Sequence, residues 1–83
     1  MRELILYGRP GCHLCEDMRA ALEEVRGTYA FRLREIDIDG DPDLAARYGT
    51  LIPVLVRDGE AICHYFLDPA ALARALAGAE AIR

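Results

Sequence analysis

The sequence contains the stretch Tyr7-Gly8-Arg9-Pro10-Gly11-Cys12-His13-Leu14-Cys15 near its start. This stretch joins an apolar run, residues 3–7, to two cysteines that are separated by two residues. Near-continuous apolar runs of this length are typical of strands buried on both faces, and glycine and proline end them. From Cys12 onward the apolar residues recur at helical spacing. We therefore expect a buried strand, a short loop and a helix that opens at the cysteine pair.

Strands and helices alternate along the rest of the chain. Asp41 and Asp68 each precede a proline, a pattern typical of a helix start, and Asp58-Gly59 is typical of a two-residue hairpin turn. The further expected elements are a helix from Cys12 that stops at Gly27, a strand from about Tyr29 to Asp39, a short helix from Asp41 to Gly49, strands over 53–56 and from about Glu60 to Phe66, and a helix from Asp68 to Gly78. The predicted order is β-α-β-α-β-β-α.

This order predicts an α/β fold in a single domain, residues 1–83. The first two strands flank a helix, so they should be parallel with a right-handed crossover, and the last two form an antiparallel hairpin. We expect a four-stranded mixed sheet with helices on both faces. Sites in such sheets form beyond the C-terminal ends of the parallel strands, where Cys12 is expected.

The composition excludes several classes of function. Ten Lys and Arg against 14 Asp and Glu give a net charge of −4, which argues against nucleic acid as a partner. No apolar run approaches the roughly 18–20 residues that span a bilayer, and no signal-peptide pattern precedes the first strand. Three cysteines are too few, and odd in number, for a secreted disulfide scaffold. We expect a soluble cytoplasmic protein, with nothing to suggest an obligate dimer.

The cysteine pair points to thiol–disulfide exchange. This chemistry needs an exposed thiolate and a second thiol in reach to resolve the mixed disulfide. At the first turn of a helix, Cys12 would face unpaired N–H groups and the positive end of the helix dipole, and Arg9 could add a positive charge. Cys15 lies one turn deeper on the same face, shielded from a large substrate. We therefore assign Cys12 as the nucleophile and Cys15 as the resolving thiol.

His13 has two interpretations. Protonated, it would favour the Cys12 thiolate; alternatively, it is an exposed residue at the helix start that contacts substrates. Glu16 and Asp17 oppose a thiolate, although acidic residues are also routine in a first helical turn. The sign of their net effect stays open at this point.

Other chemistry-bearing residues have simpler structural explanations. Cys63 is expected to be a buried small hydrophobe, and a zinc site with Cys12, Cys15, Cys63 and a histidine is disfavoured because Cys63 and His64 are strand neighbours. The acidic run 37–43 resembles a calcium loop but lacks a glutamate at the twelfth position, which is Tyr48. Tyr7 and Tyr65 are interpreted as aromatic residues at the rim of the core. We expect no metal.

The stretch 7–15 resembles the first strand and active-site loop of glutaredoxins, which carry a basic residue three positions before the first cysteine. Residues 48–53, Tyr-Gly-Thr-Leu-Ile-Pro, resemble the cis-proline loop of the thioredoxin fold. The resemblance covers essentially the whole chain and is closest to the small bacterial glutaredoxin-like proteins. It implies a thioredoxin fold and a cis Ile52–Pro53 bond against the cysteine pair. It also implies that the face around Gly11, Ile52 and Pro53 binds the substrate, whose strand pairs with the Ile52 backbone.

The sequence departs from the glutaredoxin pattern at two places. His13 replaces the proline that usually follows the first cysteine, and residues 64–68 replace a Gly-Gly turn that admits glutathione. Thr50 and Asp68 are the candidate glutathione contacts, although Asp68 is equally explained as a helix cap. The expected function is therefore thiol–disulfide oxidoreductase, with disulfide-containing proteins or glutathione mixed disulfides as partners, no tightly bound cofactor and glutathione as a cosubstrate. The alternatives are monothiol deglutathionylation, iron–sulfur cluster binding and a redox-regulated adaptor.

Overall fold

The computed structural model describes residues 2–77, and its strands and α-helices follow the order predicted from the sequence, with one further 3₁₀ helix after the second strand. The elements are β1 (Arg2–Gly8), α1 (His13–Val25), β2 (Phe31–Asp37), the 3₁₀ helix η1 (Ile38–Gly40), α2 (Pro42–Tyr48), β3 (Val54–Arg57), β4 (Glu60–His64) and α3 (Pro69–Leu76). The strands form one sheet in the order β2-β1-β3-β4, with β1 and β2 parallel and the other two pairs antiparallel. The mixed four-stranded sheet is confirmed.

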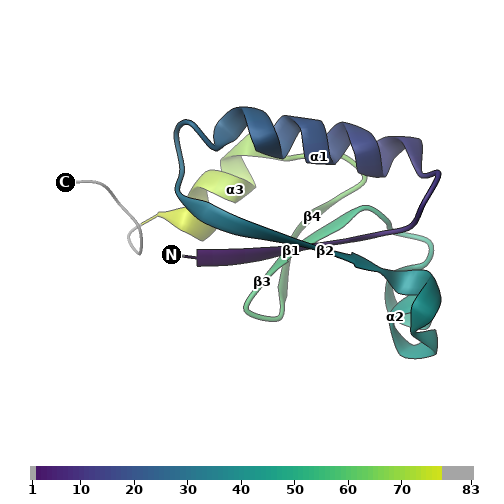
Figure 1. Cartoon of the computed structure of the whole chain (residues 1–83). Helices are drawn as coiled ribbons and strands as arrows, with labels where there is room; N and C mark the ends of the chain where they lie inside the picture. The colour runs from purple at the N-terminus through teal and green to yellow at the C-terminus, as the bar shows by residue number, and fades with distance from the viewer. Residues whose placement is uncertain (1, 78–83) are drawn as a thin grey trace.

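Helices cover both faces of this sheet, but unequally (Figure 1). α1 and α3 lie together over one face, where they bury the main core. The core residues are Leu4, Leu6, Met18, Leu22, Phe31, Leu55, Leu72 and Leu76. α2 lies on the other side, near the end of β2, and Tyr48 in α2 stacks on Tyr7 of β1 with ring centroids 4.6 Å apart.

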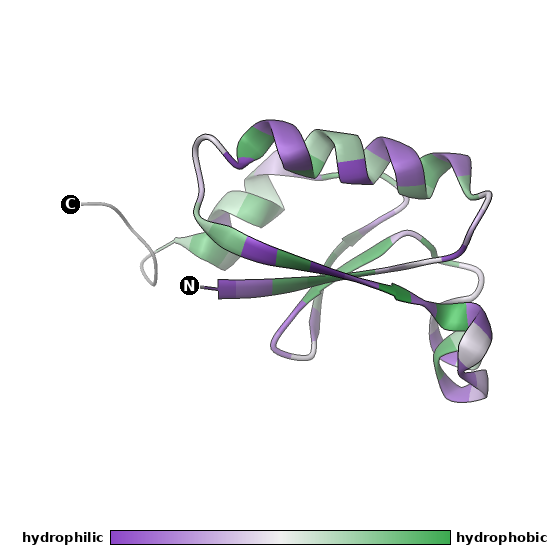
Figure 2. Cartoon of the chain, viewed as in Figure 1, coloured by the Kyte–Doolittle hydropathy of each residue, from purple (hydrophilic) through white to green (hydrophobic). Residues whose placement is uncertain are grey.

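The alternation of side chains along β1 explains this arrangement. Leu4 and Leu6 point to the α1 face and are fully buried, whereas Ile5 and Tyr7 between them are half-buried. Along α1, polar and apolar segments alternate, so that one side of the helix can pack on the sheet (Figure 2). Burying each large apolar side chain contributes roughly 1.5–3 kcal/mol. Within residues 2–77, no helix has the length and apolar character needed to cross a membrane.

Several element boundaries differ from the sequence prediction. β2 stops at Asp37 because Ile38 begins η1, which buries the Ile38 side chain completely. β4 stops at His64 because Tyr65 has a φ of +66°, outside the range of a strand. The hairpin turn at Asp58 and Gly59 is confirmed, with a positive φ at both residues. The predicted helix end at Gly78 lies outside the described residues.

Candidate active site

Cys12 and Cys15 form a disulfide where β1 gives way to α1. Cys12 is the N-cap of α1, with extended backbone angles of −86° and 111°, so it precedes the helix rather than opening it as predicted. Gly11 just before it has a φ of +78°, a conformation that glycine adopts without steric cost. The two Cα atoms are 5.1 Å apart, within the usual range for a disulfide.

The two sulfurs have different surroundings. Cys15 is only 5% exposed, whereas Cys12 is half-buried. The backbone N–H of Cys15 donates a hydrogen bond to the Cys12 sulfur, with 3.1 Å between nitrogen and sulfur. Gly8, at the end of β1, leaves room for the second sulfur, because a Cβ at this position would lie 2.8 Å from Cys15 Sγ. Cys12 is thus the more exposed of the two cysteines, and Cys15 packs against the end of β1.

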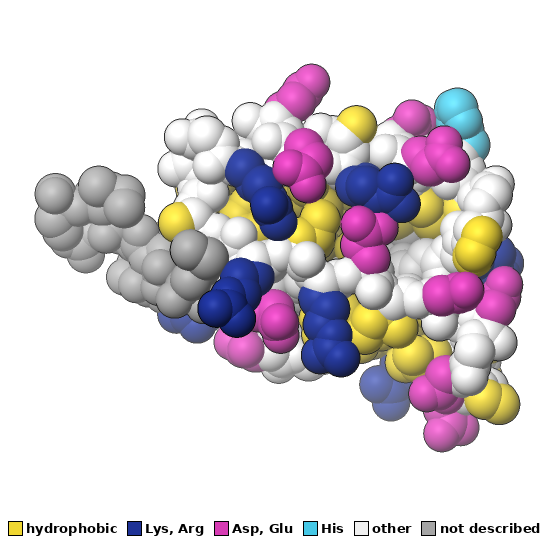
Figure 3. Space-filling model, viewed as in Figure 1, with side chains coloured by type: hydrophobic (Ala, Val, Ile, Leu, Met, Phe, Trp, Pro, Cys, Tyr) yellow, Lys and Arg dark blue, Asp and Glu magenta, His cyan; other side chains and the backbone are white. Residues whose placement is uncertain are grey.

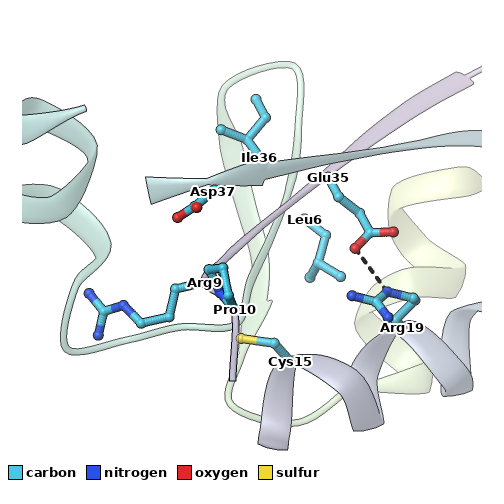
Figure 4. A pocket seen from close by; sticks show the side chains of 9 residues that line it. Leu6, Arg9, Pro10, Cys15, Arg19, Glu35, Ile36 and Asp37 are labelled. Carbon is cyan, nitrogen blue, oxygen red and sulfur yellow. Dashed lines mark hydrogen bonds and ion pairs between the residues drawn. The ribbon is translucent and has the colours of Figure 1, made fainter. Parts of the chain in front are cut away.

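A hollow of about 360 Å³ opens beside Cys15, between β1, β2 and α1 (Figure 4). Two of its lining residues form an ion pair, in which Arg19 of α1 donates to Glu35 of β2 over 2.8 Å. Over this side of the molecule, acidic and basic side chains interleave (Figure 3). Cys15 therefore lies beside a hollow that both apolar and charged side chains line.

The charged residues predicted to stabilise a Cys12 thiolate both have acidic partners. Arg9 points away from Cys15 (Figure 4). It donates to Asp39, with 3.1 Å between Nε and Oδ1. His13 is exposed, and its Nε2 lies 3.6 Å from Asp17 one turn later in α1. The positive charge that Arg9 offers to the site is therefore shared with Asp39. Stabilisation of the thiolate by Arg9 and His13 stays a prediction.

The loop that carries Ile52 and Pro53 precedes β3. Its Ile52–Pro53 peptide bond is cis, Pro53 is buried and Ile52 is half-buried. Tyr65 contacts both ends of this loop: its N–H donates to Pro53 O over 2.9 Å, and its hydroxyl donates to Thr50 O over 2.8 Å. The interpretation of Tyr65 as a core-rim aromatic is wrong, because the residue is 39% exposed and its hydroxyl bonds the loop.

Asp68, a candidate glutathione contact, caps α3. Its Oδ1 accepts hydrogen bonds from the N–H groups of Ala70 and Ala71, each over 3.1 Å. Cys63 is half-buried in β4 and packs against the core. Burial raises the pKa of the Cys63 thiol; the backbone N–H of Asp68 opposes this increase, and the Asp68 charge adds to it.

Sequence reasoning missed three residues at this site: Gly8, Tyr65 and Asp39. Gly8 was interpreted only as a strand breaker, although a glycine at the end of a buried strand also indicates close approach by another group. Asp39 belongs to the acidic run 37–43, in which Asp37 caps η1 and Asp41 caps α2. Its pairing with Arg9, 30 residues away, left no signal in the sequence.

Residues 3–77 match the family model described as Glutaredoxin-like domain (DUF836). The chain belongs to this family. An uncharacterized protein of Mycobacterium tuberculosis is 31% identical over 68 residues, which cover 76% of this chain and 70% of the relative. The solution structure of protein Ne2328 from Nitrosomonas europaea is 41% identical, covers 92% of each chain and superposes with a TM-score of 0.86.

The glutaredoxin-like domain also shares its fold with thioredoxins. Oxidized mitochondrial thioredoxin 3 from Saccharomyces cerevisiae is 27% identical, with a TM-score of 0.59 over 90% of this chain and 76% of the thioredoxin. Together with the sheet order and the placement of the helices, this match establishes the thioredoxin fold. The fold and the Cys12–Cys15 disulfide together indicate a redox function.

Proposed function

We propose that this glutaredoxin-like domain is a thiol–disulfide oxidoreductase that works by cycling Cys12 and Cys15 between dithiol and disulfide. The observation that carries the proposal is the disulfide between a half-buried Cys12 at the start of α1 and a Cys15 that is 5% exposed. An exchange enzyme needs one thiol that meets the substrate and one that meets only the first thiol. The unequal burial supports Cys12 in the first role and Cys15 in the second.

The reduction of a substrate disulfide proceeds in two exchanges. The Cys12 thiolate attacks one substrate sulfur, forms a mixed disulfide and releases the other substrate sulfur as a thiolate. Cys15, once deprotonated, attacks Cys12 Sγ and releases the second substrate thiolate. Two electrons pass to the substrate, the released sulfurs take up the two protons, and the protein ends as the Cys12–Cys15 disulfide.

Backbone groups support the Cys12 thiolate directly. The Cys15 N–H that donates to Cys12 Sγ over 3.1 Å would make a charge-assisted hydrogen bond to a thiolate. The N-terminus of the 13-residue α1 adds the positive end of its dipole. The positive charge of Arg9 also stabilises the thiolate, but Asp39 compensates part of that charge. A protonated His13 acts in the same way, and Asp17 compensates part of its charge.

The substrate binds across Gly11 and the loop of Ile52 and Pro53. Among the hydrogen bonds of residues 2–77, none uses the backbone N–H or C=O of Ile52. These groups can pair with an extended peptide that carries the target cysteine. We infer that the partner is a disulfide-containing protein and that the domain acts as a monomer in the cytoplasm.

Glutathione serves as the cosubstrate that recycles the disulfide, without any tightly bound cofactor. Thr50, exposed on the loop, and Asp68 are its proposed contacts. The two capping hydrogen bonds of Asp68 use Oδ1, so Oδ2 can meet the glutathione amine. No observation favours iron–sulfur cluster binding, so it is not proposed.

The proposal is tested by equilibrating a Cys63→Ser variant across glutathione redox buffers and measuring the intact mass. We expect a species that has lost two hydrogens, and we expect the Cys12→Ser variant to lack it. A dominant adduct with one glutathione would instead assign monothiol deglutathionylation. If neither species forms, Cys12 is not a reactive thiol and the proposal is wrong.

A further inference from the structure

Tyr65 has a backbone conformation that needs an explanation. Its φ is +66°, which is uncommon for an aromatic residue because the side chain crowds the backbone there. Such conformations persist only where the surrounding structure holds them, and they concentrate at functional sites. Asp58, the other non-glycine residue with positive φ in residues 2–77, lies in the β3–β4 hairpin, where the turn type demands this conformation. Tyr65 is instead the central residue of a γ-turn, in which the Phe66 N–H donates to His64 O over 2.7 Å, and this turn is rare and strained for a non-glycine residue.

The contacts of Tyr65 supply the explanation. The backbone N–H donates to Pro53 O over 2.9 Å, and the hydroxyl donates to Thr50 O over 2.8 Å. One residue therefore holds both ends of the segment 50–53. Tyr65 is 39% exposed and its ring meets His64 edge-on, so burial in the core is not what fixes it.

The hydroxyl contact also decides which backbone groups of the loop stay available. It occupies the carbonyl of Thr50, whereas no hydrogen bond within residues 2–77 uses the backbone of Ile52. An extended peptide that reaches this loop would therefore find its free donor and acceptor at Ile52. A small disulfide without a peptide backbone would gain nothing from this arrangement.

We propose that Tyr65 is a positioning residue that braces the segment 50–53 so that the Ile52 backbone can bind peptide substrates, which makes peptide disulfides the preferred substrate class. This inference rests on the proposed oxidoreductase function. Within residues 2–77, the hydrogen bonds of Tyr65 go to Pro53 and Thr50 and not to either reacting sulfur, so we expect it to affect binding of the peptide and not the exchange itself.

The test compares the Tyr65→Phe variant with the wild-type domain on two substrates, with dithiothreitol as the reductant. One substrate is a disulfide-linked peptide dimer and the other is bis(2-hydroxyethyl) disulfide. The variant loses only the bond to Thr50, so we expect KM for the peptide to rise about three- to tenfold, the factor for one neutral hydrogen bond, with kcat unchanged. KM for the small disulfide should not change.

Two further variants separate positioning from general stability. Tyr29→Phe removes a hydroxyl far along the chain that makes no hydrogen bond within the described residues, and it should leave both KM values unchanged. Tyr65→Gly fits the positive φ but lacks the hydroxyl, so it should raise the peptide KM at least as much as Tyr65→Phe.

Each outcome decides one of the two proposals. If the wild-type domain reduces the peptide and Tyr65→Phe has the same KM, the positioning role is wrong and the oxidoreductase function stands. A parallel rise in KM for both substrates also overturns it, because the effect would not depend on a peptide backbone. If the wild-type domain reduces neither substrate, the proposed function fails, and the role of Tyr65 fails with it.

Discussion

Gly8 and Cys15 are in contact across the boundary between β1 and α1, with no space for a larger residue at position 8. A Cβ on Gly8 would lie 2.8 Å from Cys15 Sγ and 3.3 Å from Cys15 Cβ, closer than side chains normally approach. Gly8 itself is buried, and the disulfide ties Cys15 to Cys12, the N-cap residue of α1. The absence of a side chain at Gly8 is therefore what allows the helix to place the second sulfur against the sheet.

The Gly8→Ala variant should therefore be destabilised. Neither β1 nor the disulfide can move without disturbing the core, so we expect the free energy of unfolding to fall by about 1–3 kcal/mol. Gly27→Ala is the matched control, since a Cβ there meets nothing within 4 Å and should change stability by less than about 0.5 kcal/mol. Urea unfolding of both variants measures the difference, and equal stabilities would show that the contact does not restrict position 8.

Because Arg9 pairs with Asp39, removing either charge should change the alkylation rate of Cys12, and the two changes should have opposite signs. In a chain with Cys15→Ser and Cys63→Ser, Asp39→Asn should speed alkylation of Cys12 below neutral pH, because Arg9 is then uncompensated. Arg9→Gln should slow it. Each substitution is expected to change the alkylation rate about two- to threefold at low salt and less at high salt, since both side chains are partly exposed.

Asp43→Asn is the control for this pair, because Asp43 carries the same charge in the same acidic run without contacting Arg9. Its alkylation rate should match that of the parent chain. If Arg9→Gln leaves the rate unchanged, Arg9 does not stabilise the thiolate.

Cys63 should react slowly at neutral pH. Burial raises the pKa of its thiol above the ordinary value of 9.0, so a smaller fraction is thiolate at any pH below that value. In the oxidised protein, Cys63 is the free thiol, and its alkylation rate should rise with pH to a midpoint above 9.0. Unfolding in urea should return the midpoint to the ordinary value. A midpoint below 9.0 in the folded protein would contradict the account.

Substitutions at Asp68 separate capping from glutathione binding. Asp68→Ala should lower the free energy of unfolding by roughly 0.5–2 kcal/mol, and Asp68→Asn should cost less because asparagine also caps helices. If Oδ2 meets the glutathione amine, Asp68→Asn should nevertheless slow reduction by glutathione several-fold while reduction by dithiothreitol is unchanged. If glutathione reduces Asp68→Asn and the wild-type domain at the same rate, Asp68 has the capping role alone.

The sequence was sufficient for the element order because each element has a local cause. The apolar run 3–7, the caps at Asp41 and Asp68 and the turn at Asp58 act over a few residues, and all four are confirmed. The predicted strand ends were wrong where tertiary contacts determine them. β4 ends early because Tyr65 turns to bond Thr50, and β2 ends early because Ile38 is buried as part of η1.

In the candidate site too, the sequence predicted the local features and not the long-range contacts. The spacing of Cys12 and Cys15 at a strand-to-helix loop was enough to place the disulfide, which is a local feature. The fold brings together Arg9 and Asp39, which are distant in the sequence. It also places Cys15 against Gly8, where a side chain would not fit. Such pairings have no periodicity or spacing in the sequence, so only the structure reveals them.

The central claim is that Cys12 attacks the substrate and Cys15 resolves the mixed disulfide. The most direct measurement is the intact mass of reduced Cys15→Ser and Cys12→Ser variants, both carrying Cys63→Ser, after mixing with a disulfide-linked peptide dimer. We expect Cys15→Ser to accumulate an adduct with one peptide and Cys12→Ser to carry none. An adduct on Cys12→Ser alone, or on neither variant, would contradict it.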